Sequence, residues 1–181
     1  MGGFHDHIRE QEKAFIEKQK MFFVATAPLA QDTHINLSPK GGDSFRVLSQ
    51  NRVAYMDLVG SGNETSAHLL ENGRITFMFC SYDGPPNILR LYGTGHTVLP
   101  KDAEWEELSA LFPLLTHTRQ IIVADIYKIQ NSCGYSVPLY TYTGERTQAQ
   151  QWAEKKGIEG IEEYKKEKNR ISIDGLPTAL Y

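Results

Sequence analysis

The sequence predicts a mainly β protein with some helices (α+β), built around an antiparallel barrel. Two observations carry this prediction. Between residues 21 and 131, short apolar segments alternate with tight turns. The same region holds only two short helical segments, too few to cross over between parallel strands. The flanking residues 1–20 and 132–181 are charged and favour helices, so the predicted organisation is an amino-terminal helix, a barrel at 21–131 and a helical carboxy-terminal extension.

The first elements follow from local patterns. Asp6 is a plausible cap for a helix that reaches residue 20, because an aspartate oxygen can accept helix N–H groups. The next short runs predict strands, and the sequence Pro39-Lys40-Gly41-Gly42 predicts a turn that closes the second of them. The predicted strands in this half cover residues 21–26, 33–38, 45–48 and 53–59.

The second half continues the alternation. A short helix is predicted at 66–71, ended by Asn72-Gly73, and strands at 75–80, 88–98 and 120–129. Gly93 and Gly95 within the long strand indicate a bulge or a close backbone approach. Asp102 predicts the start of a helix that extends to about residue 111, and the carboxy-terminal helices are expected at 148–156 and 160–168.

Composition narrows the classes of function. The chain has 181 residues, with 19 basic and 22 acidic side chains for a net charge of -3, and the basic residues form no stripe of the kind that binds nucleic acid. Two distant cysteines indicate a reducing compartment, and no segment is long and apolar enough for a signal core or a membrane span. We therefore expect a cytoplasmic protein without nucleic-acid or membrane partners. The six histidines are scattered and predict no metal site.

A glycine-rich turn before the first internal helix is the best candidate for binding chemistry. The turn reads Gly60-Ser61-Gly62-Asn63-Glu64-Thr65. Gly62 allows close backbone approach, Ser61, Asn63 and Thr65 offer polar side chains, and a helix amino terminus favours an anion such as phosphate. The alternative is an ordinary strand-to-helix connection in which Asn63 only caps the helix.

Three segments in this order resemble the pyridoxamine 5′-phosphate oxidase-like superfamily of split barrels that bind flavin mononucleotide (FMN). The resemblance covers about residues 20–131. The segments are Ile35-Asn36-Leu37-Ser38-Pro39-Lys40-Gly41, then Val53-Ala54-Tyr55-Met56-Asp57 with the glycine-rich turn and Asn72-Gly73-Arg74-Ile75-Thr76-Phe77, and finally Ile88-Leu89-Arg90-Leu91-Tyr92-Gly93-Thr94-Gly95.

The resemblance implies an antiparallel split β-barrel and a homodimer with FMN between the subunits. It places the backbone of Ile35, Asn36 and Leu37 along the flavin ring, and Ser38 and Lys40 beside the cofactor, with Lys40 balancing phosphate charge. Ser61, Gly62, Asn63 and Thr65 would hold the phosphate. The carboxy-terminal helices would pack on the barrel or on the dimer partner.

The chain also departs from the oxidase pattern. Ser61-Gly62-Asn63 stands where the oxidase has Ser-Arg-Lys, and the tail has no counterpart of the oxidase's arginine-containing substrate motif. Arg46 is a candidate to replace the missing cations. Arg119, at the start of the last strand, is a candidate to reach the site or the dimer seam, and a surface or interface role is the alternative. Trp152 either stacks on a flavin or packs a helix.

These features predict an FMN-dependent oxidoreductase that acts on a small molecule. One alternative is a non-catalytic flavin- or tetrapyrrole-binding protein, and another is a reductase that uses the deazaflavin F420. No residue has a pattern that identifies it as a catalytic acid or base.

Overall fold

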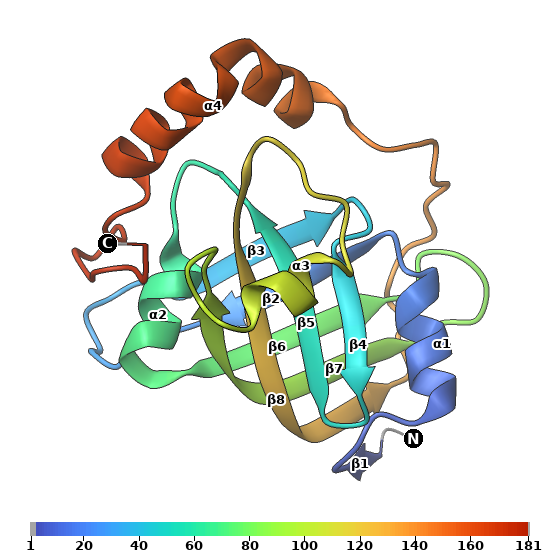
Figure 1. Cartoon of the computed structure of the whole chain (residues 1–181). Coiled ribbons are helices and arrows are strands. Elements are labelled where there is room, and N and C mark those ends of the chain that lie inside the picture. Colours follow the sequence, from blue (N-terminus) through green and yellow to red (C-terminus); the bar gives the residue numbers. More distant parts are fainter. Residues whose placement is uncertain (1–2, 181) are drawn as a thin grey trace.

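The computed structural model describes residues 3–180 and contains one curled antiparallel sheet with four helices around it (Figure 1). The strand order is β3-β2-β6-β7-β8-β5-β4, and β1 pairs with β8. The predicted fold class, an antiparallel split barrel with helices at both ends of the chain, is confirmed. The strands are β1 (Phe4–His5), β2 (Met21–Thr26), β3 (Asn36–Gly41), β4 (Phe45–Ser49), β5 (Arg52–Leu58), β6 (Arg74–Cys80), β7 (Ile88–Val98) and β8 (Thr118–Ser132).

The two longest strands, β7 and β8, lie next to each other in the middle of the sheet and pair from Ile88 to Val98. Their register shifts between Tyr92 and Gly93, so the predicted bulge is present. A Cβ atom at Gly93 would lie 2.6 Å from the carbonyl oxygen of Asp125, a distance that no side chain tolerates. Glycine is therefore required at this bulge, where the backbone of β8 comes close.

The helices are α1 (Glu10–Lys18), α2 (Glu64–Asn72), α3 (Trp105–Ser109) and α4 (Gln148–Lys168). α2 ends at Gly73, whose left-handed backbone (φ 73°) provides the predicted stop. α4 contains the predicted break, since Gly157 has φ 69° and ψ 176° and kinks the helix between its two halves.

Two predicted helix starts are wrong. α1 begins after Arg9 and not after Asp6, because the carboxylate of Glu12 reaches back to accept the Arg9 backbone N–H at 2.9 Å. The residues around Asp6 instead follow the short strand β1. Asp102 also caps no helix, since its carboxylate accepts the Leu99 N–H at 2.8 Å within a turn, and α3 is shorter than predicted.

The predicted turn at residues 39–42 starts too early. β3 continues through Pro39, which pairs with Phe23 of β2. β3 is an edge strand, so the missing N–H of proline can face away from the ladder without loss of a hydrogen bond. The turn follows at Gly42 and Asp43, both with positive φ.

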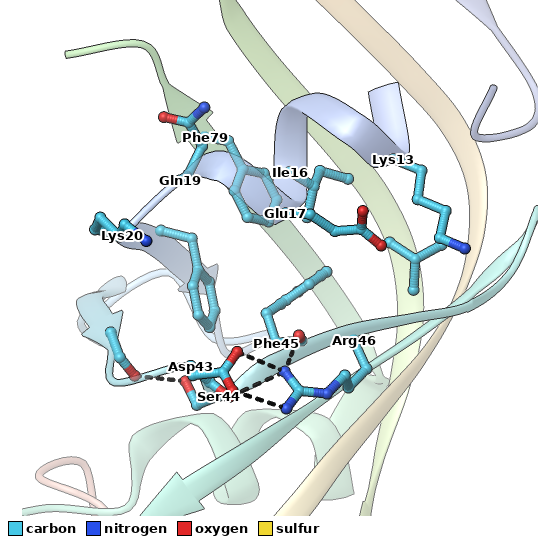
Figure 2. Close-up of a pocket in the computed structure, with 13 residues that line it drawn as sticks. Lys13, Ile16, Glu17, Gln19, Lys20, Asp43, Ser44, Phe45, Arg46 and Phe79 are labelled. Carbon is cyan, nitrogen blue, oxygen red and sulfur yellow. Dashed lines mark hydrogen bonds and ion pairs between the residues drawn. The ribbon is translucent and has the colours of Figure 1, made fainter. Parts of the chain in front are cut away.

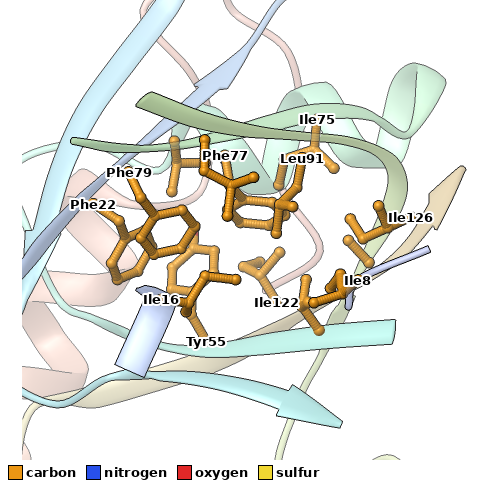
Figure 3. Packing of buried hydrophobic residues seen from close by; sticks show 14 of the residues in the cluster. Ile8, Ile16, Phe22, Tyr55, Ile75, Phe77, Phe79, Leu91, Ile122 and Ile126 are labelled. Carbon is orange, nitrogen blue, oxygen red and sulfur yellow. The ribbon is translucent and has the colours of Figure 1, made fainter. Parts of the chain in front are cut away.

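Aliphatic and aromatic side chains together fill the barrel (Figure 3). The Phe22 ring lies 5.6 Å from both Tyr55 and Phe79, measured between centroids. A smaller cluster joins Val59 to Ala153 and Ile161, which attaches α4 to the end of β5. None of the helices within the described residues is long and apolar enough to cross a membrane.

Candidate functional site

A cavity of about 680 Å³ lies where the end of β5, the turn at 60–63 and the start of α2 meet β3 and the carboxy-terminal segment. This volume is within the range of cofactor pockets. Seven of the nine residues expected to bind a cofactor line it: Asn36, Ser38, Lys40, Ser61, Gly62, Asn63 and Thr65. The fold therefore brings the two predicted segments together in one pocket.

The turn presents its backbone to this cavity because Asn63 does not cap α2. Asn63 occupies the cap position, but its side chain makes no capping hydrogen bond. Its Oδ1 accepts from Gln120 Nε2 at 2.8 Å, and its Nδ2 donates to the carbonyl of Asn169 at 3.2 Å. The first N–H groups of α2 thus have no intrahelical acceptor and no side-chain cap from Asn63. The alternative in which Asn63 only caps the helix is therefore wrong.

The floor of the pocket is organised by Asp57 at the end of β5. Its carboxylate, 1% exposed, accepts from Lys40 Nζ at 2.7 Å, Arg119 Nη2 at 2.6 Å and Gln120 Nε2 at 2.8 Å. Burial alone would raise the pKa of the Asp57 carboxyl, but the adjacent Arg119 and Lys40 cations outweigh burial and hold this pKa well below its usual range. Asp57 is therefore a permanent anion that fixes two cations.

Arg119 is the cation beneath the turn. It is 4% exposed, and besides its bonds to Asp57 it donates from Nη1 to the carbonyl of Gly62 at 2.8 Å. From the sequence, a place for Arg119 at the site was only one alternative beside a surface or interface role. The signal was its place at the start of a long strand, but a strand position cannot show that β8 lies beside β5 and carries this side chain to Asp57.

Asn36 is fixed by a separate polar network. Its Nδ2 donates to Thr26 Oγ1 at 3.2 Å and to Thr65 Oγ1 at 3.0 Å, while its Oδ1 accepts from Ser38 at 3.0 Å. Thr26 in turn contacts Nδ1 of the buried His68 at 2.9 Å. This network holds β3 against α2 and sets the width of the pocket at the turn.

The formal charges of the lining balance. Basic side chains come from Lys40, Arg119 and Lys168, and acidic ones from Asp57, Glu64 and Glu167. An anionic ligand therefore gains little from the net side-chain charge of the pocket. Its favourable contacts would be the N–H groups of the turn and the part of Lys40 that remains exposed, since this side chain is 23% accessible.

Other expected residues lie elsewhere. Ile35 and Leu37 are 76% and 63% exposed and do not line the cavity. Arg46 does not replace the missing turn cations, because it bonds to Asp43 and to the carbonyl of Leu111. Trp152 packs against Tyr164 with 5.0 Å between ring centroids, so helix packing is its role in this chain.

A second cavity of about 310 Å³ lies between α1 and β4 (Figure 2). Its floor is aromatic, with Phe22, Phe45 and Phe79, and the nearby Arg46 is occupied by Asp43. None of the nine expected cofactor-binding residues lines this cavity. The residues expected to bind a cofactor therefore gather at the cavity at the turn and not at this one.

A family model described as Pyridoxamine 5′-phosphate oxidase matches residues 8–132. The chain belongs to this family. The match runs from just before α1 to the end of β8. It therefore includes β3, β5 and β8, the strands that contribute residues to the pocket.

One sequence relative agrees with this membership, and two solved structures share the fold. A pyridoxamine 5′-phosphate oxidase family protein of Aspergillus flavus, ustO, is 38% identical over 191 residues, which cover 96% of this chain and 76% of the relative. A HupZ variant of Group A Streptococcus has a similar fold, with TM-score 0.56, 20% identity and coverage of 69% and 99% of the two chains. The FAD binding protein of Mycobacterium smegmatis matches with TM-score 0.50, 14% identity and coverage of 71% and 97%.

Proposed function

We propose that this member of the pyridoxamine 5′-phosphate oxidase family binds FMN in the cavity at the turn and acts as an oxidoreductase on a small molecule. Family membership supports a flavin, and one protein of similar fold is described as FAD-binding. The observation that carries the proposal is the uncapped start of α2 beside Lys40 within a single cavity.

The residues present fit the phosphate end of FMN. The turn offers backbone N–H groups, the Ser61 hydroxyl is exposed, and Lys40 can reach an anion from the opposite wall. A deazaflavin with a longer anionic tail would need more cationic side chains than this balanced lining supplies. FMN is therefore favoured over F420.

The bound flavin would supply the redox chemistry, and the chain would bind and orient it. The titratable groups on the floor, Asp57, Lys40 and Arg119, are paired with one another and do not offer a free acid or base. This pairing favours a second candidate, a non-catalytic flavin carrier. The two candidates differ in whether an electron donor reduces the bound flavin.

The decisive experiment compares FMN with riboflavin, which lacks the phosphate. We expect FMN to bind more tightly, and Lys40→Met to raise its dissociation constant about tenfold or more through loss of a charged hydrogen bond, with little change for riboflavin. Lys40→Met keeps most of the apolar stem. Binding is measured by flavin fluorescence, with Lys101→Met, at an exposed lysine outside the cavity, as the matched control.

The outcomes separate the interpretations. Absence of binding for both flavins at micromolar protein would refute the flavin proposal. Equal weakening of both flavins by Lys40→Met would show that Lys40 does not face the phosphate. Anaerobic addition of NADH, NADPH or pyridoxamine 5′-phosphate then tests turnover, because bleaching of the flavin absorbance indicates an oxidoreductase and a persistent spectrum indicates a carrier.

We further propose that two copies associate and that the second copy completes the flavin site. Large apolar side chains remain exposed along the edge strand and in the segment before α4, where a partner would cover them. They are Ile35, Leu37, Tyr135, Leu139, Tyr140 and Tyr142. Ile35 and Leu37 would then approach the flavin from the dimer seam.

A further inference from the structure

The chain folds back on itself after α4 and forms a small hairpin, residues 169–179. An isolated antiparallel bridge joins Ile171 to Pro177. The Ser172 N–H donates to the carbonyl of Leu176 at 2.8 Å, and the Gly175 N–H donates to that of Ser172 at 3.0 Å. Figure 1 shows this carboxy-terminal segment in red beside α2 and the blue loop that leads into β3.

The base of the hairpin is fixed in the protein. Asn169 is fully buried and Thr178 is 1% exposed. Asn169 Nδ2 donates to the carbonyl of Gly60 at 2.9 Å, and the Asn169 carbonyl accepts from Thr178 Oγ1 at 2.8 Å. The Ala179 N–H donates to Ser66 Oγ at 3.0 Å. Buried hydrogen bonds of this kind resist local opening.

The tip of the hairpin, residues 171–174, is held differently. It spans the cavity from the turn to the approach of β3 through two contacts near solvent. The Ile173 N–H donates to the Glu64 carboxylate at 3.1 Å. The Asp174 carboxylate accepts from both the backbone N–H of His34 at 2.9 Å and its Nδ1 at 2.7 Å, and the His34 side chain is 71% exposed.

The tip also contributes apolar side chains to the cavity. Ile171, Ser172 and Ile173 line it, and the two isoleucines are 61% and 73% exposed. Aliphatic groups on the wall of a polar cavity gain stability when a flat apolar ring covers them. These isoleucines therefore offer an apolar surface beside the polar groups of the turn in the same cavity.

We propose that the hairpin tip is a movable outer wall of the flavin pocket, in which Ile171 and Ile173 contact the bound ring and the Asp174–His34 contact controls its release. This inference rests on the proposed function, because it assigns a role toward the same ligand. The fixed base acts as the hinge, and opening breaks the two contacts at the tip, Ile173 with Glu64 and Asp174 with His34.

The test measures the rate at which FMN leaves the full-length protein after dilution into an FMN-free solution, followed by the fluorescence of released FMN. His34→Ala removes the ring contact and keeps the backbone bond, so we expect release about fivefold faster, the effect of one hydrogen bond. Asp174→Ala removes both bonds and should accelerate release further.

A matched pair tests the apolar contact. Ile173→Ala should speed release, whereas Ile158→Ala should leave it unchanged, because Ile158 is 75% exposed, as Ile173 is at 73%, but lies on α4 outside the cavity. Equal release rates in all of these variants, with FMN still bound at equilibrium, would refute the movable wall and leave the flavin proposal intact.

A ligand-free measurement completes the test. In Asp174→Ala without FMN, amide exchange should accelerate at Ile173 and stay unchanged at Thr178, which belongs to the base. Unchanged exchange at Ile173 would contradict the proposal even if FMN does not bind. Absence of FMN binding in the unmodified protein would refute the proposed function itself.

Discussion

At the scale of single residues, Asp57 determines the chemistry of the pocket floor. In the sequence, Asp57 is a single acidic residue near the end of an apolar strand, and no neighbouring residue indicates a partner for it. In the structure it pairs with a lysine and an arginine from two other strands. The turn at 60–65 carries no lysine or arginine, and this buried acid instead holds Lys40 and Arg119 beside the cavity.

Asp57→Asn should destabilise the protein by about 3–5 kcal/mol, because Arg119 would be left buried without its counter-charge. The free energy of unfolding in urea measures this loss. Asp43→Asn is the control, since the Asp43 side chain is 79% exposed and asparagine tolerates its positive φ of 54°. A loss below about 1 kcal/mol would show that Lys40 and Arg119 do not depend on this carboxylate.

At the scale of elements, α1 is fastened to the barrel by one buried acid. Glu12 is 3% exposed and contacts Arg9 at 2.7 Å, His5 at 2.8 Å and Asn131 of β8 at 2.8 Å. Burial raises the pKa of Glu12, but hydrogen bonds from Arg9, His5 and Asn131 outweigh it and lower the pKa to about 2. The helix is thus attached through its first turn.

The depressed pKa predicts a pH dependence. The stabilisation by the Glu12 carboxylate is complete above the unfolded pKa of about 4.3 and is lost as pH falls toward about 2. Thermal unfolding between these values should show a smaller pH dependence in Glu12→Gln than in the unmodified protein. Glu17→Gln, at an exposed position of the same helix, should retain the full dependence. Parallel curves for Glu12→Gln and the unmodified protein would contradict this role.

At the scale of the whole molecule, one chain leaves large apolar side chains of its edge strand uncovered. The isoleucine and leucine that the family resemblance places along the flavin ring are exposed and do not line the cavity. The proposed dimer would cover this edge and would explain why the segment before α4 exposes large apolar side chains.

Association is tested by light scattering after size-exclusion chromatography. We expect a dimer for the unmodified chain and a shift toward monomer, with weaker FMN binding, for Leu37→Glu, because a charge would be buried at the seam. Leu70→Glu is the control at an exposed position of α2 outside the proposed seam, with 58% exposure beside the 63% of Leu37. A monomer at all concentrations would refute the dimer.

The sequence by itself indicated the family, through the resemblance of three segments, and predicted most of the strands in their succession along the chain. Local patterns are sufficient for the strands, the Gly73 stop and the Gly157 break, because these depend on neighbouring residues alone. The sequence also identified seven residues that share one cavity. Only the tertiary structure decided that Asn63 turns away from α2, that Arg119 reaches Asp57, and that residues 171–173 wall the pocket. Each of these depends on contacts between residues more than fifty positions apart, whose partners are chosen by strand pairing and packing.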